Sequence, residues 1–228
     1  MMAHKLNPSI AHIPMPPGVK KLPIAANGFP VPWFVKWLDD APEFRVADGA
    51  KHALAIRERR CWVCGERLDN RATFPIGPMC ALNRVTSEPP CHPACAEYSV
   101  RACPFLARPN MVRREGGIPE EAGFAGHAIE RNPGVVCLWT GRWPGAERFG
   151  DGMGGMLFRI FPPLAVEWWA EGRKATRAEV MASVESGLPL LRDMAEKQGP
   201  LAIEALERMF AEAQPLFERI SVGGSIDA

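Results

Sequence analysis

The chain has no hydrophobic run long enough to cross a bilayer. Such a run needs about 20 consecutive apolar residues, so a membrane-spanning helix is excluded. The N-terminal stretch MMAHKLNPSIAHIPMPPGVKK also lacks the apolar centre that a secretory signal requires. We therefore expect a cytoplasmic protein that has no membrane partner.

Recognisable catalytic motifs are missing as well. No HExxH sequence occurs, and the glycine-rich stretch Gly150–Gly155 is not followed by the Lys-Ser/Thr of a phosphate-binding loop. The segment PCHPAC, at residues 90–95, resembles one half of a nucleobase-deaminase signature, but the HxE half is absent. Neither a Ser-His-Asp order nor a paired-carboxylate motif can be read. The sequence thus offers no support for an enzymatic activity.

Net charge is close to zero, because 27 Lys and Arg face 26 Asp and Glu. The charge of the whole chain therefore selects no partner. Its distribution is uneven: residues 51–115 hold 11 Lys and Arg against six Asp and Glu, whereas residues 176–228 hold five against nine. Either the two segments neutralise each other within the molecule, or the basic segment binds an anionic partner, of which nucleic acid is the commonest.

Cysteine, in contrast, is abundant. The chain holds seven cysteines, and six of them fall between residues 61 and 103. Their number is odd and no export signal accompanies them, so metal ligands are a better interpretation than disulfides. The seven are Cys61, Cys64, Cys80, Cys91, Cys95, Cys103 and Cys137.

Two pairs of residues have the spacing of zinc ligands. Cys61 and Cys64 form a CxxC knuckle, in which a tight turn presents two thiolates and the following glycine lets backbone amides point at the sulfurs. His92 and Cys95 are three residues apart, which suits two ligands on the first turn of a helix. Together they predict one structural Zn²⁺ in a treble-clef-like module, because four protein ligands leave no open position for catalysis.

The fourth ligand has alternatives. Cys91 and Cys95 are four residues apart and can also share one ion, and Cys80, in the turn IGPMC, is a further substitute for His92. We favour His92, because a spacing of three residues places both donors closer together on a first turn. Cys103 lies about 12 Å beyond Cys95 along a helix and is too distant to share the ion.

The cysteine segment carries a resemblance. RCWVCGERL, IGPMCALNR and EPPCHPACAEYSVRACPFL, together with WWAEGRKATRAEVMASVESGLPLL, are similar to segments of a group of uncharacterised bacterial and phage proteins. The four segments cover about half of the chain. The resemblance implies a protein of bacterial or phage type but brings no established activity. In that group the PPxH element is constant and Cys91 is not, which further favours His92.

The patterns predict an α+β fold with a treble-clef-like zinc module, a small antiparallel sheet and a helical C-terminus. The share of hydrophobic residues, 47%, excludes disorder of the whole chain. Residues 1–32, which hold seven of the 23 prolines, are expected to form an extended Pro-rich arm. Residues 33–115 are expected to form the zinc module with a flanking helix, and residues 116–228 a small sheet followed by helices.

Local signals place some of the elements. Asp48 is the expected N-cap of a helix over residues 47–60. The apolar runs 134–141 and 155–161 are expected to pair as an antiparallel hairpin across a long glycine-rich loop.

The last third of the chain reads as helical. A capping box, in which Thr176 and Glu179 satisfy each other's backbone amides, predicts a helix that ends at Gly187. Two further helices are expected over residues 188–197 and 199–213. The last of these has an apolar stripe for the core, formed by Leu201, Ala205, Leu206, Met209, Phe210 and Ala213.

The sequence therefore predicts a zinc-stabilised intracellular binding protein of bacterial or phage type, which contacts nucleic acid or a host protein complex. The alternative is an enzyme that acts on nucleic acid, in which a structural zinc supports an active site containing His127 or Asp151. Both interpretations place an ordered cysteine segment beside an anionic or protein partner.

Overall fold

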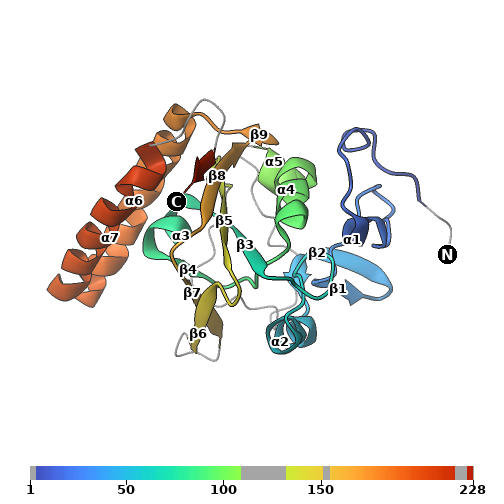
Figure 1. The fold of residues 1–228 in the computed structure, drawn as a ribbon, viewed down its shortest axis with the longest axis horizontal. Helices are drawn as coiled ribbons and strands as arrows, with labels where there is room; N and C mark the ends of the chain where they lie inside the picture. The colour runs from blue at the N-terminus through green and yellow to red at the C-terminus, as the bar shows by residue number, and fades with distance from the viewer. Residues whose placement is uncertain (1–3, 109–131, 151–154, 219–224, 228) are drawn as a thin grey trace.

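A computed structural model describes residues 4–108, 132–150, 155–218 and 225–227 (Figure 1). It has an α+β fold with a helical C-terminus, as the sequence predicts. A central antiparallel sheet carries long helices on one face, and the cysteine segment and N-terminal residues lie on the other side. We call these the helical face and the cysteine face. No described helix has the length and apolar character that crossing a membrane needs.

The central sheet is built from five strands: β3 (Arg71–Ile76), β5 (Val136–Arg142), β8 (Ala165–Ala170), β9 (Arg173–Lys174) and β10 (Ser225–Asp227). Its order is β10-β8-β5-β3, and β9 also pairs with β8. Successive side chains of β5 point to opposite faces, so Cys137 and Trp139 pack on the helical face, whereas Val136 and Leu138 pack on the cysteine face. Both faces of the middle strand are therefore buried, which explains its continuous apolar run.

Three helices cover the helical face: α3 (Pro78–Asn83), α6 (Arg177–Gln198) and α7 (Pro200–Glu218). The predicted capping box at the start of α6 is confirmed, because the Thr176 hydroxyl accepts from the Glu179 amide at 3.3 Å and the Glu179 carboxylate accepts from the Thr176 amide at 2.7 Å. Trp139, Trp168 and Phe217 are fully buried between the sheet and these helices. These side chains belong to the apolar core of this face, and burial of such surface is the main stabilising term in folding.

The helix that was expected to end at Gly187 continues to Gln198, so that prediction is wrong. A Cβ at Gly187 would lie 2.9 Å from Cγ of Met79, and the glycine is therefore the residue that lets α6 approach α3. Glycine inside a helix costs about 1 kcal/mol relative to alanine, and close packing offsets this cost here. The last helix, α7, buries Leu206 but leaves Leu201 exposed, so Leu201 does not belong to the core stripe.

The predicted pairing of 134–141 with 155–161 is also wrong. The later run forms β7 (Met156–Ile160), which lies between β6 (Ala146–Gly150) and β4 (Val85–Thr86) in a separate three-stranded sheet. Part of the expected glycine-rich loop, AERFG, is itself strand β6. The run in β5 takes its two neighbours from β3 and β8 instead, because it is buried on both faces and sits in the middle of a sheet.

The described part of the N-terminal segment is folded rather than extended, in contrast to the predicted arm over residues 1–32. It forms turns and one helical turn, α1 (Pro17–Lys20). Ile10, Ile13 and Val19 are buried against the cysteine segment. Prolines fix the backbone dihedral φ and favour turns, so a proline-rich chain can still carry apolar residues into a core.

A hairpin and a helix connect this segment to the cysteines. Strands β1 (Val35–Leu38) and β2 (Ala41–Ala47) pair across a turn at Asp39 and Asp40. Helix α2 (Gly49–Glu58) follows, and the Asp48 carboxylate accepts from two backbone amides of its first turn, which confirms the predicted N-cap.

The predicted regions 33–115 and 116–228 share one sheet. Strand β3 pairs with β5 over six residues, from Arg71 opposite Arg142 to Ile76 opposite Cys137. The boundary that was predicted between residues 115 and 116 lies outside the described residues. The central sheet therefore belongs to both regions and supplies each with an apolar face.

Candidate metal centre

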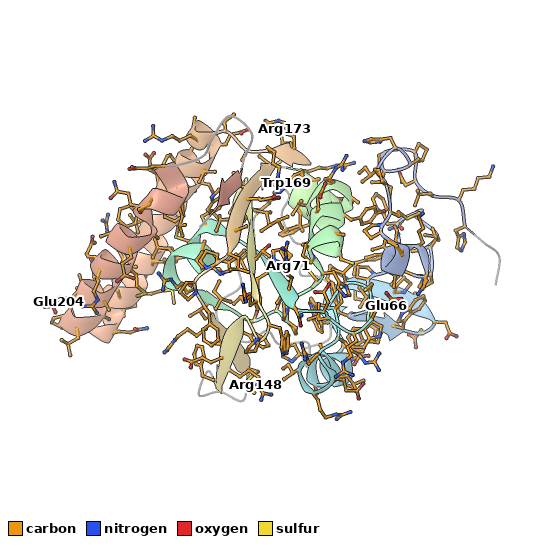
Figure 2. The ribbon with its side chains drawn as sticks, viewed as in Figure 1. Glu66, Arg71, Arg148, Trp169, Arg173 and Glu204 are labelled. Atoms are coloured by element: carbon orange, nitrogen blue, oxygen red, sulfur yellow. The ribbon has the colours of Figure 1, made fainter. Side chains whose placement is uncertain are left out.

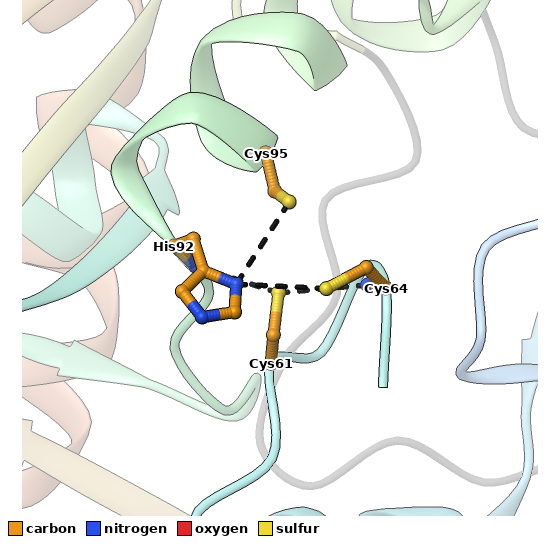
Figure 3. Close-up of side chains that lie close together, drawn as sticks. All are labelled: Cys61, Cys64, His92 and Cys95. Carbon is orange, nitrogen blue, oxygen red and sulfur yellow. Dashed lines mark hydrogen bonds between the residues drawn. The ribbon is translucent and has the colours of Figure 1, made fainter. Parts of the chain in front are cut away.

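Four side chains converge at the cysteine face: Cys61, Cys64, His92 and Cys95 (Figure 3). Their donor atoms, three Sγ and one histidine nitrogen, all lie within 4.8 Å of one another, and the three cysteines are buried. Ligands of a tetrahedral zinc lie about 2.3 Å from the ion when they are sulfurs, which sets them roughly 3.7 Å apart. The cluster therefore has the size and the donor set that one metal ion needs.

The first two donors come from a tight knuckle. The Cys64 amide donates to Cys61 Sγ at 3.5 Å, and the Gly65 amide donates to the Cys61 carbonyl at 2.8 Å. Gly65 has a φ of +75°, and a Cβ there would lie 2.5 Å from the ring of Trp33. Only glycine fits this position, because the turn needs a positive φ and the tryptophan packs directly on its backbone.

The other two donors come from the start of helix α4 (Pro93–Ala102), which is followed by α5 (Pro104–Ala107). His92 is the extended N-cap residue, Pro93 opens the first turn, and Cys95 lies within that turn. The His92 amide donates to Cys61 Sγ at 3.4 Å. The helix start therefore delivers one imidazole, one thiol and a backbone amide to the same place.

The imidazole ring of His92 is held at both nitrogens. Nδ1 lies 3.5 Å from Cys64 Sγ and 4.0 Å from Cys95 Sγ, and Nε2 lies 3.1 Å from the Arg67 carbonyl. A histidine that ligates a metal usually donates its other ring N–H to a carbonyl or carboxylate, which fixes its tautomer. The Arg67 carbonyl accepts that hydrogen bond when Nδ1 faces the ion.

Cys91 points away from the cluster. Its Sγ donates to the Thr73 carbonyl at 3.3 Å, and its backbone makes two hydrogen bonds of 2.9 Å to the same residue of β3. Cys80 lies in α3, where burial raises the pKa of its thiol to about 11. Of the alternatives for the fourth position, the structure thus brings His92, and neither Cys91 nor Cys80, to the other three donors.

The thiols of the cluster share protons unequally. Burial by itself raises the pKa of Cys61. Hydrogen bonds from Cys64, from Cys95 and from two backbone amides outweigh this effect and lower the pKa to about 3. The pKa of Cys95 moves in the opposite direction, first because it donates to Cys61. These shifts favour a thiolate at the buried Cys61 sulfur, and a bound cation compensates such a charge.

The N-terminal segment covers the knuckle, and the sequence contained no signal for this contact. A Cβ at Gly18 would lie 2.9 Å from Cys64 Sγ, and Lys21 forms an ion pair with Glu66 beside it. The contact joins residues far apart in the chain and follows no periodic pattern. Gly18 therefore closes the metal centre on the side of Cys64.

Four arginines of the basic segment line an open hollow beside the knuckle. Its volume is about 390 Å³, and we call it the arginine hollow; it is lined by Arg57, Glu58, Arg59, Arg60 and Arg67. Arg60 is held by Glu58 at 2.8 Å and by the Gly65 carbonyl at 3.0 Å. Arg59 lies over the ring of Trp143, with Cζ 4.8 Å from the ring centroid. Such stacking orients a guanidinium without neutralising it.

The residues of the enzymatic alternative, His127 and Asp151, lie outside the described residues. The structure consequently places neither of them relative to the cluster. Comparison of the chain with protein-family models, with curated proteins and with solved structures finds no match. The geometry of the cysteine cluster and its surroundings is therefore the basis for assigning a function.

Proposed function

We propose that the protein is a zinc-stabilised binding protein that contacts nucleic acid. The observation that carries the zinc is the convergence of Cys61, Cys64, His92 and Cys95 on one point. Three thiolates and one imidazole are soft and borderline donors, which select zinc over calcium or magnesium. Four protein ligands also complete a tetrahedral shell, so the ion has a structural role.

The surrounding elements support a treble-clef-like module. A knuckle supplies the first ligand pair, strand β3 follows it, and the first turn of α4 supplies the second pair. In this arrangement the ion joins the knuckle to the first turn of α4. The bacterial or phage type and the cytoplasmic location remain parts of the proposal, supported by the resemblance of the cysteine segment.

The nucleic-acid partner is supported by the arginine hollow. Four arginines line it against one carboxylate, Glu58, which pairs with Arg57 and Arg60. Nucleic-acid binding is dominated by contacts between such cations and backbone phosphates. A surface of this composition matches a polyanion better than a neutral or cationic protein surface.

Neutralisation within the molecule does not account for the hollow. Among the described residues, the ion pair that joins the basic segment to the acidic helices is Arg84–Glu212, at 3.5 Å, and neither residue lines the hollow. Glu204 of α7 lies at the opposite end of the molecule from Glu66, which marks the knuckle (Figure 2). The acidic helices are thus too distant to serve as the partner of the hollow.

The test is binding of labelled DNA and RNA, single-stranded and double-stranded, by the zinc-loaded protein over a series of salt concentrations. We expect the logarithm of the affinity to fall linearly with the logarithm of the salt concentration. Arg67→Gln should weaken binding, because Arg67 lines the hollow, whereas Lys197→Gln on α6 should not. Absence of salt-dependent binding to all four probes overturns the nucleic-acid partner and favours a protein complex.

A further inference from the structure

Two arginines lie directly opposite each other at one end of the central sheet. In the register of β3 and β5, Arg71 pairs with Arg142, and both side chains are exposed (Arg71 is labelled in Figure 2). Like charges at directly opposed positions of an antiparallel pair destabilise the sheet. Within the described part of the chain, neither guanidinium has a carboxylate partner. The pair is therefore an electrostatic cost that the fold itself does not offset.

The pair stands on the cysteine face of the sheet. Two residues further along each strand, the hydroxyls of Thr73 and Thr140 are hydrogen-bonded at 2.9 Å, and Thr73 is the residue that holds Cys91. Side chains two positions apart in a strand share a face. Arg71 and Arg142 thus extend from the same face of the sheet as the metal centre.

A third guanidinium, that of Arg59, contacts residues that are close to the pair in the chain. Arg59 lies over Trp143, the neighbour of Arg142, and donates from Nη2 to the Asp69 carbonyl at 3.3 Å. Its Nε is buried and has no hydrogen-bond partner among the described residues. Trp143 is itself anchored, because its amide donates to the Asn70 carbonyl at 3.0 Å. Arg59 is therefore oriented in advance by the Trp143 ring and the Asp69 carbonyl.

The nearby carboxylate is already engaged by the backbone. Asp69 Oδ1 accepts from the Arg71 amide at 2.8 Å, which caps the start of β3. Even when the Asp69 carboxylate is counted, the surface formed by Arg59, Arg71 and Arg142 has an excess of positive charge. Guanidinium groups present planar pairs of N–H donors that match phosphate oxygens, and these charge-assisted hydrogen bonds are stronger than neutral ones.

We propose that Arg71, Arg142 and Arg59 together bind one backbone phosphate of a nucleic acid. This inference rests on the proposed function and locates its contact surface. A bridging phosphate converts the repulsion between Arg71 and Arg142 into attraction to a shared anion. Arg59 also lines the arginine hollow, so the phosphate site and the hollow form one continuous surface. Continuity favours a chain of phosphates over a single free anion.

The test compares the zinc-loaded protein with Arg71→Gln, Arg142→Gln and the double variant in the same binding assay. Arg208→Gln is the matched control, because Arg208 is exposed on α7 and the substitution removes the same charge. Each single variant should weaken binding uniformly across sequences, because a phosphate contact carries no sequence information. The double variant should lose less than the sum of the singles, since both arginines contact one phosphate.

Thermal unfolding of each variant distinguishes a loss of nucleic-acid binding from a loss of protein stability. Removing one of two opposed like charges should leave the melting temperature unchanged or raise it, so weaker binding cannot result from unfolding. If the wild type binds nucleic acid and neither Arg71→Gln nor Arg142→Gln changes that binding, this inference is overturned and the proposed function stands. Wild-type protein that binds no nucleic acid removes both. Tight binding of inorganic phosphate without nucleic-acid binding identifies a free-anion site and also overturns the inference.

Discussion

On the helical face of the central sheet, Phe74, Trp139 and Trp168 pack beneath α6 and α7. On the cysteine face, the buried cluster combines Trp62, Tyr98 and Trp169 with the thiols of Cys61, Cys64 and Cys95. Large apolar side chains stabilise a core through the surface that they remove from water. The cysteine face differs by the sulfur donors inside its core, and under the proposed function part of its stability comes from the ion that they bind. One sheet thus joins an apolar core to a core that also holds a candidate metal centre.

Loss of the metal should produce the largest difference in stability between the two faces. Cys64→Ser removes a ligand from the cluster, and we expect the protein to lose its zinc, which contributes on the order of 10 kcal/mol to a small module. Hydrogen exchange should then speed up in α4 while α7 keeps its protection. Metal analysis and hydrogen exchange measure the two effects.

Two cysteine variants serve as controls for that experiment. Cys103→Ser should retain one zinc per chain, because Cys103 lies beyond the helix that carries the ligands. Cys91→Ser should also retain zinc, because the Cys91 thiol faces Thr73. Zinc-free protein that is fully folded in circular dichroism contradicts the dependence of the cysteine face on the ion.

A charged side chain introduced into the core of the helical face should destabilise the protein. Leu206 is 5% exposed and Leu201 is 81% exposed on the same helix. Leu206→Asp buries an unpaired carboxylate and should lower the free energy of unfolding by about 4 kcal/mol, whereas Leu201→Asp should change it by less than about 0.5 kcal/mol. Chemical denaturation measures both. Equal effects would show that α7 does not pack as described.

Gly18, which covers the knuckle, tests how tightly the cysteine face is packed. Gly18→Ala places a methyl group 2.9 Å from Cys64 Sγ, so we expect a loss of about 1–3 kcal/mol and faster removal of zinc by a chelator. Gly49→Ala is the control, because nothing lies within 4 Å of its added Cβ. A chelator competition assay follows the zinc, and an unchanged rate for Gly18→Ala contradicts the close contact.

The smallest effect belongs to the capping box of the helical face. The Arg173 guanidinium and the Thr176 groups lower the pKa of Glu179 to about 2. Because the folded pKa lies below the unfolded value, this stabilisation is complete above about pH 4.3 and is lost as the pH falls towards 2. Solvent screens the pair, so Glu179→Gln should cost less than about 1 kcal/mol at neutral pH.

Its pH dependence distinguishes that effect from a general surface change. As the pH falls towards 2, the unfolding free energies of the wild type and Glu179→Gln should converge, since the Glu179 carboxyl becomes protonated in the unfolded chain and then in the folded one. Glu204→Gln, on the exposed side of α7, should have little effect at either pH. Chemical denaturation at neutral pH and at pH 2 provides the comparison, and a difference that is as large at pH 2 as at neutral pH argues against the charge of Glu179 as its cause.

Contacts between neighbours in the chain were predictable from the sequence. The N-cap at Asp48, the capping box at Thr176 and the two ligand pairs, Cys61 with Cys64 and His92 with Cys95, are each formed within four residues. Backbone geometry at that range depends on residue type and spacing alone. The sequence therefore determined where helices begin and which residues are able to converge as ligands.

Contacts between distant segments were decided by tertiary structure. Pairing of β5 with β3 and β8, the continuation of α6 past Gly187, and the contact of Gly18 with Cys64 all join surfaces that carry no common pattern. The same is true of the opposition of Arg71 and Arg142, which depends on strand register. A shift of one residue would move every side chain of a strand to the other face, and only packing of the whole core selects the register.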